Sequence, residues 1–230
     1  MALAGALPVH ADTTETLRPD TIQARVAACT ACHGVQGKAG ADGYYPRLAG
    51  KPEAYLYQQL LSFRDGARVY RPMSHLLSGL PDDYLREMAA YFSQQHAPYP
   101  RPVQAQSSAA TLARGRTLAE VGDAALGLPA CTACHGAKLS GTAPAIPGLL
   151  GLPRDYIGSQ LGSWHSGLRR AHAPDCMADV ANKLTPEDVA AVAIWLSAQP
   201  VVEPYVPDPV AVSDLPATCG AQQLERGVSQ

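Results

Sequence analysis

The sequence contains little lysine, little phenylalanine and no long apolar run. Only two of its 230 residues are Phe, and the lysines are confined to Lys38, Lys51, Lys138 and Lys183. No apolar stretch approaches the roughly 20 residues that span a bilayer, so the sequence predicts no transmembrane segment of its own. The net charge of -2 offers no basic surface for nucleic acid or an anionic membrane, and the scarcity of lysine excludes a broad lysine-rich docking ring.

Glycine and proline are abundant, with 20 of each in a sequence that is 47% hydrophobic. That hydrophobic share is sufficient for packed cores and too high for a disordered chain. The length predicts one large domain or two small ones. Small domains with many loops and few large apolar side chains usually need an additional element to fill their centres.

The N-terminal segment 1–19 starts with an apolar stretch that ends in Val9-His10-Ala11. This ending resembles the A-x-A cleavage site of a secretory signal peptide, although the charged region that normally precedes it is missing. Two interpretations stay open: the remnant of a signal peptide, or a frayed end without function.

An internal repeat organises the rest of the chain. The hexapeptide Cys-Thr-Ala-Cys-His-Gly begins at Cys29 and again at Cys131, and Met73 corresponds to Met177 at nearly the same offset. Landmarks in the same order at a nearly constant offset predict two copies of one domain. The resulting organisation is a first domain at 20–96, a Pro-rich linker at 97–108, a second domain at 109–200 and a tail at 201–230.

Both copies are predicted to be helical. Apolar residues recur at spacings of three and four, and Thr185-Pro186-Glu187-Asp188 combines a capping side chain, proline at the first helical position and acids in the first turn. No segment indicates a strand, so the expected fold class is all-α. The predicted helices are 21–28, 53–63, 82–93, 109–120, 154–164 and 186–198.

Each Cys-x-x-Cys-His motif is typical of covalent haem c attachment. Two thiols at this spacing reach the two vinyl groups at one porphyrin edge, and the adjacent histidine directs its imidazole at the iron. A zinc site usually needs four Cys or His ligands and a thioredoxin-like pair needs a βαβ context, and neither condition is met. We expect two haem c groups, the first held by Cys29, Cys32 and His33 and the second by Cys131, Cys134 and His135.

The remaining iron ligand is specified less directly. Met73 and Met177 occupy equivalent places, expected to be loops before the last helix of each copy, and a thioether ligand raises the haem potential as an electron carrier requires. Met88 lies on the apolar stripe of a predicted helix and is assigned to the core. His75 and His172 are the alternative ligands near the two methionines, and neither has a histidine partner in the other copy.

Arginines precede both candidate methionine ligands. They are interpreted as partners of haem propionates or of other structural groups, as a docking patch, or as parts of an ordinary solvated loop. The residues concerned are Arg64, Arg68, Arg71, Arg169 and Arg170.

Together these motifs resemble the cytochrome c4 family of diheme periplasmic cytochromes. The resemblance rests on the two hexapeptides, on the segments 46–50 and 55–63, on Met88-Ala89-Ala90-Tyr91-Phe92 and on the second copy over 114–200, about three quarters of the chain. It implies two cytochrome c folds related by a pseudo-twofold axis, with the haems close to the domain interface. It also implies that Met73 serves the first haem and Met177 the second.

Two features depart from that family: Cys176, directly before Met177, and an irregular Pro-rich tail that carries Cys219. Haem c attachment occurs in an oxidising compartment, where a leftover pair of cysteines usually forms a disulfide. A Cys176–Cys219 bridge is therefore expected to hold the tail beside the second haem. The alternative is Cys176 as an axial thiolate, as in some thiosulfate-oxidising diheme enzymes. With four prolines and little helical pattern, the segment 201–216 is not expected to bury enough apolar surface to order itself.

The expected function is electron transfer without catalysis, as a carrier or as the cytochrome subunit of a redox complex. Its partners would be periplasmic or membrane-bound: a dehydrogenase or bc1-type donor, and a terminal oxidase or other acceptor. The expected location is the bacterial periplasm. The alternative is a diheme oxidoreductase, thiosulfate dehydrogenase-like or a peroxidase, which needs an exchangeable iron position with acid–base groups nearby.

Overall fold

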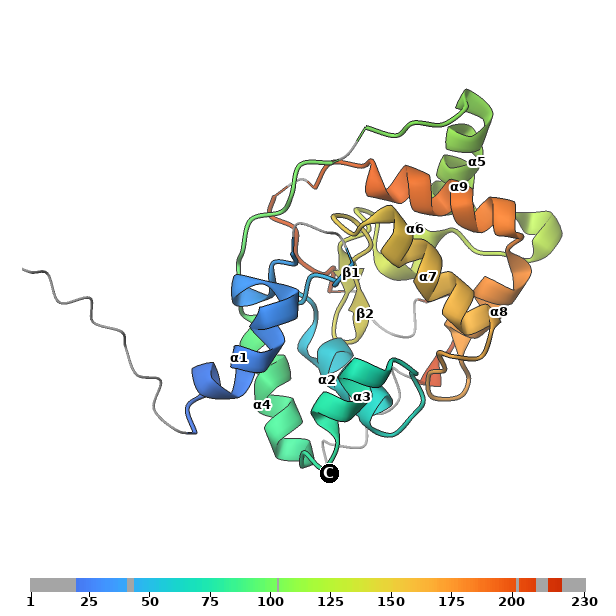
Figure 1. The fold of residues 1–230 in the computed structure, drawn as a ribbon. Coiled ribbons are helices and arrows are strands. Elements are labelled where there is room, and N and C mark those ends of the chain that lie inside the picture. The colour runs from blue at the N-terminus through green and yellow to red at the C-terminus, as the bar shows by residue number, and fades with distance from the viewer. Residues whose placement is uncertain (1–19, 41–43, 103, 202, 210–214, 221–230) are drawn as a thin grey trace, which may run out of the picture.

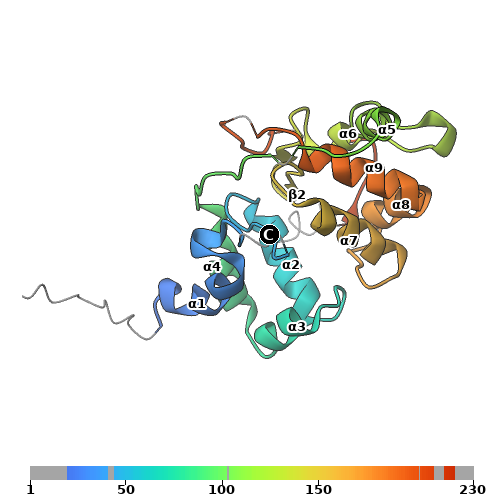
Figure 2. The same ribbon diagram turned by 45° about the horizontal axis from the view of Figure 1, so that its top comes forward.

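The computed structural model describes residues 20–40, 44–102, 104–201, 203–209 and 215–220. The segment 1–19, which carries the resemblance to a cleavage site, and residues 221–230 lie outside this part of the chain. The described chain is mostly helical, and its helices form two groups that lie side by side (Figure 1, Figure 2). No helix among the described residues is long and apolar enough to cross a membrane.

The first group of helices packs around its own core. α1 starts after Thr21, whose hydroxyl accepts a hydrogen bond from the Ala24 amide, and it continues through the first Cys motif as far as His33. Met88 is buried in this core, as its place on an apolar stripe predicts. The elements are α1 (Ile22–His33), the 3-10 turn η1 (Val35–Gly37), α2 (Glu53–Arg64), α3 (Arg71–Leu77) and α4 (Asp82–Ser93).

The second group forms a separate core around a close helix crossing. Gly115 of α5 lies directly against the Ala191 carbonyl of α9, where an added Cβ would overlap that oxygen, so glycine is required there despite its cost within a helix. Thr185 and Asp188 form the predicted cap of α9 as a reciprocal capping box. The helical elements are α5 (Ala109–Glu120), the 3-10 turn η2 (Ala124–Leu126), α6 (Cys131–His135), α7 (Arg154–His165), α8 (Cys176–Lys183) and α9 (Pro186–Ser197).

One short ladder departs from the expectation that no strand is present. β1 (Gly141–Thr142) pairs antiparallel with β2 (Ile146–Pro147) in the loop after the second Cys motif. With only two residues per strand, it has too little sequence for an alternating pattern to be recognised. The all-α class otherwise holds, with two tandem domains as expected.

The two domains meet through a reciprocal backbone contact. Arg68 and Arg169 form an isolated antiparallel bridge, flanked by hydrogen bonds of 2.7 Å from the Val69 amide to the Leu168 carbonyl and from the Arg170 amide to the Ala67 carbonyl. Arg68 and Arg169 occupy equivalent positions in the repeat. Equivalent residues of the two domains thus pair with each other, as a pseudo-twofold axis between the domains requires.

The tail is irregular, as predicted, and the segment around Tyr205 is held against the second domain. The Tyr205 side chain is buried in the second core, where its hydroxyl donates to the Leu139 carbonyl and accepts from the Leu150 amide. Asp208 continues the contact by exchanging backbone hydrogen bonds of 2.9 Å with Gly141 and Ala143. The tail has no core of its own and is ordered by the surface of the second domain, which a local pattern does not reveal.

Candidate haem sites

A cavity of about 1120 Å³ is lined by residues of both domains. It exceeds the roughly 300–1,000 Å³ of a pocket for one small ligand, so it has room for more than one large group. Most of the predicted haem residues line it, and Cys32, which is exposed, is the exception. The lining includes Cys29, His33 and Met73 from the first domain and Cys131, Cys134, His135 and Met177 from the second.

Both motif histidines are held in the tautomer that suits an iron ligand. His33 Nδ1 lies 2.8 Å from the Pro46 carbonyl, and His135 Nδ1 lies 2.7 Å from the Pro147 carbonyl. A carbonyl only accepts, so Nδ1 carries the proton and the Nε2 lone pair is left for a metal. Burial lowers the pKa of both imidazoles, that of His135 to about 4, which keeps them neutral at physiological pH.

The four motif cysteines are not paired with one another. Burial raises the pKa of the Cys29 and Cys134 thiols and raises that of Cys131 to about 11. Redox-active cysteine pairs have lowered thiol pKa values, and no cluster of metal-ligating residues is found among the described residues. Both features argue against the thioredoxin-like and zinc interpretations.

The methionines lie on short helices and not in the loops that the sequence predicts. Met73 is on α3 and Met177 is on α8, and each is half-buried against the core of its domain while lining the cavity. Helices of seven and eight residues are too short for a periodic pattern to be recognised and depend on tertiary packing. Of the alternative ligands, His75 is exposed and outside the cavity lining, and His172 is exposed at its rim.

Two buried arginines bring uncompensated positive charge to the cavity. Arg68 is 8% exposed and Arg169 is 6% exposed, both line the cavity, and neither forms an ion pair with a described carboxylate. Their side chains donate to the neutral oxygens of Gln59, Gln160 and two tyrosines, Tyr55 and Tyr156. Buried cations require an anion for stability, and the propionates of haem are anions of this kind.

A tryptophan adds a second unsatisfied group. The indole Nε1 of Trp164 is buried without a hydrogen-bond partner among the described residues, although this side chain lines the cavity. Its ring also stacks under the Arg169 guanidinium at 3.8 Å. Histidines with free Nε2 atoms, unneutralised arginines and an unpaired indole N–H together fit a bound group that carries both a metal and carboxylates.

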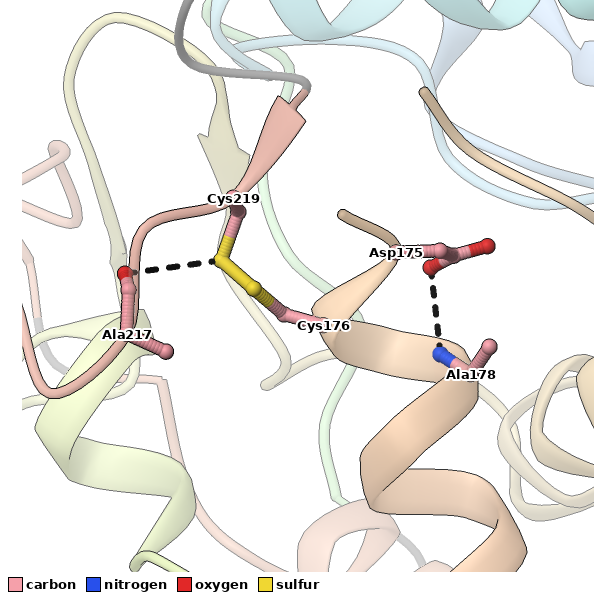
Figure 3. The surroundings of a disulfide bond; sticks show 5 residues. All are labelled: Asp175, Cys176, Ala178, Ala217 and Cys219. Carbon is pink, nitrogen blue, oxygen red and sulfur yellow. Dashed lines mark hydrogen bonds between the residues drawn. A yellow bond between two sulfur atoms is a disulfide. The ribbon is translucent and has the colours of Figure 1, made fainter. Parts of the chain in front are cut away.

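A disulfide joins Cys176 to Cys219, 43 residues apart, at the start of α8 (Figure 3). Asp175 caps the helix by accepting a hydrogen bond of 3.1 Å from the Ala178 amide, next to the bridge. Gly220 then packs against the backbone of His172 and Ala173, and its amide donates to the Pro174 carbonyl. The tail is thus fixed to the turn before Met177, and Cys219 itself lines the cavity.

Sequence reasoning missed the polar groups that surround the two arginines. Gln59 and Gln160, like Tyr55 and Tyr156, stand at equivalent repeat positions, which was the signal available for finding them. Their contacts cross between the domains, with Arg68 reaching Gln160 and Arg169 reaching Gln59. The repeat matches the residues in pairs, and only the docking of the domains shows that the pairs meet.

Comparisons with known proteins agree with this geometry. The Cytochrome c family model matches residues 22–101. The chain is 39% identical to a thiosulfate dehydrogenase electron acceptor from Thiomonas intermedia (76% of this chain, 80% of that protein) and 35% identical to a cytochrome c4 from Pseudomonas aeruginosa (76% and 85%). The structure is similar to that of reduced cytochrome c4 from Pseudomonas stutzeri, with a TM-score of 0.67 and 32% identity over 77% of this chain and 96% of that one.

Proposed function

This chain belongs to the cytochrome c4 family of diheme electron-transfer proteins, and from that premise we propose that it accepts electrons from a sulfur-oxidising dehydrogenase and passes them on without catalysing a reaction itself. Like its family it carries two covalently bound haem c groups. The observation that carries the proposal is the shared cavity, where both domains present a neutral histidine and a methionine beside buried cations.

The proposed assignment of residues follows the repeat. Cys29 and Cys32 would attach the first haem, with His33 and Met73 as its iron ligands. In the second domain Cys131 and Cys134 would attach the haem, with His135 and Met177 as iron ligands. A haem c supplies one-electron redox chemistry at its iron. The protein fixes the imidazole tautomers through the Pro46 and Pro147 carbonyls and offers Arg68, Arg169 and Trp164 to the propionates. The proposed domain limits are 20–96 and 109–200.

A carrier is favoured over an enzyme by the groups around each iron position. Catalysis at iron requires an exchangeable coordination position, whereas each domain places a half-buried methionine in the cavity lining. The axial-thiolate alternative is disfavoured because the Cys176 sulfur is bonded to Cys219 and is not free to ligate.

The electron donor is proposed from relatives whose names state a function. The Thiomonas intermedia protein is a thiosulfate dehydrogenase electron acceptor, and it aligns with 76% of this chain. We infer a donor of the same chemical class, a dehydrogenase that releases electrons from a reduced sulfur compound.

The proposed location is the bacterial periplasm. Covalent haem attachment and a Cys176–Cys219 disulfide both belong to an oxidising compartment, and cytosolic thiols are normally kept reduced. Fractionation of cells that produce the full-length protein tests this directly. Recovery of the haem-bearing protein with the cytosol would contradict it.

The function is tested with purified holoprotein in two steps. Mass spectrometry of the denatured protein should give the mass of the chain plus two haems. Thiosulfate alone should leave the oxidised haems unreduced, and addition of a catalytic amount of thiosulfate dehydrogenase should reduce both. Sustained thiosulfate oxidation by this chain alone would establish the enzyme alternative instead. Failure of the dehydrogenase to reduce it would remove the proposed donor while leaving the carrier function in place.

A further inference from the structure

The first domain places one buried lysine at the second domain's haem site. Lys51 is 5% exposed, although it belongs to the loop before α2, and its Nζ donates a 2.6 Å hydrogen bond to the Gly148 carbonyl of the second domain. Gly148 follows Pro147, whose carbonyl holds His135 Nδ1. Lys51 thus lies one peptide unit from the group that orients the second haem's histidine.

This lysine has no anionic partner among the described residues. It appears in none of the ion pairs, and its one side-chain hydrogen bond goes to a neutral carbonyl. The other cation close to it is Arg47, which is turned toward the linker, where it donates to the Ala97 and Pro98 carbonyls and stacks on Tyr99. Lys51 lines the cavity, so its charge faces the space that the prosthetic groups share.

Lys51 has no charged counterpart at the equivalent position of the second domain. The residue equivalent to Lys51 in the second domain is Leu152, which is buried in the second core and uncharged. The first haem's histidine, His33, therefore has no buried ammonium donated to it from the other domain. The first site has a buried cation from its own domain, because Arg47, which is 3% exposed, follows Pro46 and corresponds to Gly148. The second site receives its cation, Lys51, from the other domain.

We propose that Lys51 is a tuning residue for the second haem: its buried ammonium raises the reduction potential of the haem held by His135, in the other domain. A fixed positive charge in a medium of low dielectric constant favours the redox state with one more electron. Loss of this charge would therefore move the electron that the two haems share toward the first domain. This inference rests on the proposed haem ligation.

The test measures both midpoint potentials of the holoprotein by spectroelectrochemical titration at pH 6. Burial lowers the pKa of Lys51 to about 7, so the ammonium form prevails at that pH. The variants are Lys51→Met and Lys51→Gln, which both remove the charge, although Gln keeps a donor for the Gly148 carbonyl. Leu152→Met is the matched control at the equivalent position, where no charge changes.

The two haems are distinguished by repeating the titrations in a Met73→His background. Exchange of the thioether for imidazole lowers the first haem's potential and leaves the second to titrate separately. If that background leaves both potentials unchanged, the ligation in the proposed function is wrong, and this result is independent of Lys51.

With ligation established, Lys51→Met and Lys51→Gln should both shift the electron-sharing equilibrium between the haems about tenfold toward the first, which is about 59 mV for one electron. Leu152→Met should leave it unchanged. The proposal is overturned if the potentials of both haems shift equally or if the electron-sharing equilibrium changes less than twofold. It is also overturned if Lys51→Gln retains the wild-type potentials. The last result would assign the effect to the hydrogen bond and not to the charge. Should Lys51→Met fail to fold, Lys51→Gln alone decides between these outcomes.

Discussion

Arg68 and Arg169 donate to the same two glutamine oxygens across the domain interface. Each guanidinium reaches Oε1 of both Gln59 and Gln160, at distances of 2.5 to 2.9 Å. Two like charges thus share one set of neutral acceptors, and they lie where the backbones of the two domains are bridged. The interface is built around positive charge that no carboxylate among the described residues neutralises.

Because the two arginines share acceptors, their substitutions should not be additive. Arg68→Met and Arg169→Met should each lower the free energy of unfolding by about 1–3 kcal/mol, since each half-buried glutamine oxygen loses one of its two charged donors. The double variant should differ from the sum of the single variants by at least about 0.5 kcal/mol, measured by denaturant titration of the holoprotein. Arg170→Met, at an exposed neighbour, is the control and should change little. Simple additivity would show that the two side chains act independently.

Replacement of either proposed methionine ligand should affect one haem only. Met73→Ala and Met177→Ala should each lower one of the two midpoint potentials and open one iron to cyanide, because a thioether raises haem potential and blocks the position it occupies. Met88→Leu, in the core, and His75→Ala, on the surface, are controls that should retain both potentials. Unchanged cyanide binding in the Met73 variant would point back to His75 as a ligand, and in the Met177 variant to His172.

The disulfide should stabilise the second domain through the tail. Its cysteines are 43 residues apart, and a loop of that size contributes about 3–4 kcal/mol in the chain-entropy model. Cys176→Ser with Cys219→Ser should therefore lower the denaturation midpoint, and peptide mapping of the unreduced wild type should recover the linked pair. Free thiols in freshly purified protein would contradict the bridge. If stability falls while the second haem's spectrum and potential are unchanged, the bridge holds the tail without supporting Met177.

Tyr205 should be the main anchor of the tail before the disulfide. Tyr205→Phe keeps the ring but leaves the buried Leu150 amide without its acceptor, which costs about 1–3 kcal/mol of unfolding free energy. Val206→Ala is the matched control, because the Val206 side chain is 57% exposed and its truncation should stay within about 0.5 kcal/mol. Equal effects of the two substitutions would mean that the tail is held by other contacts.

The ion pairs of Arg114 should make stability depend on pH. Arg114 donates to Asp123 and Asp188 at 2.8 and 2.7 Å, which holds the pKa of both carboxyls below the usual range. A lowered carboxyl pKa stabilises the fold above the unfolded-state pKa of about 4, and this stabilisation is lost as the pH falls through the folded-state value. The Tm difference between wild type and Arg114→Met should therefore be constant near neutrality and shrink below about pH 4. An undiminished difference at pH 3 would rule out the ion pairs as its source.

The sequence by itself determined the features that depend on local spacing. The two Cys-x-x-Cys-His motifs, their repetition and the longer helices such as α4 and α9 follow from residues within a few turns of one another. The leftover cysteine pair was also predictable, since four of six cysteines are assigned to the motifs. Short-range patterns predict these features because the backbone geometry that places the residues is itself local.

Only the tertiary structure decided what depends on residues far apart in the sequence. The short helices of Met73 and Met177, the ordering of the tail by Tyr205, and the placement of Lys51 against Gly148 have no local signature. Each is stabilised by packing or by a hydrogen bond to another part of the fold, so intrinsic propensity is too weak to predict it. Arg68 and Arg169 could be matched through the repeat, but only the docking of the two domains brings both guanidiniums to the same pair of glutamines.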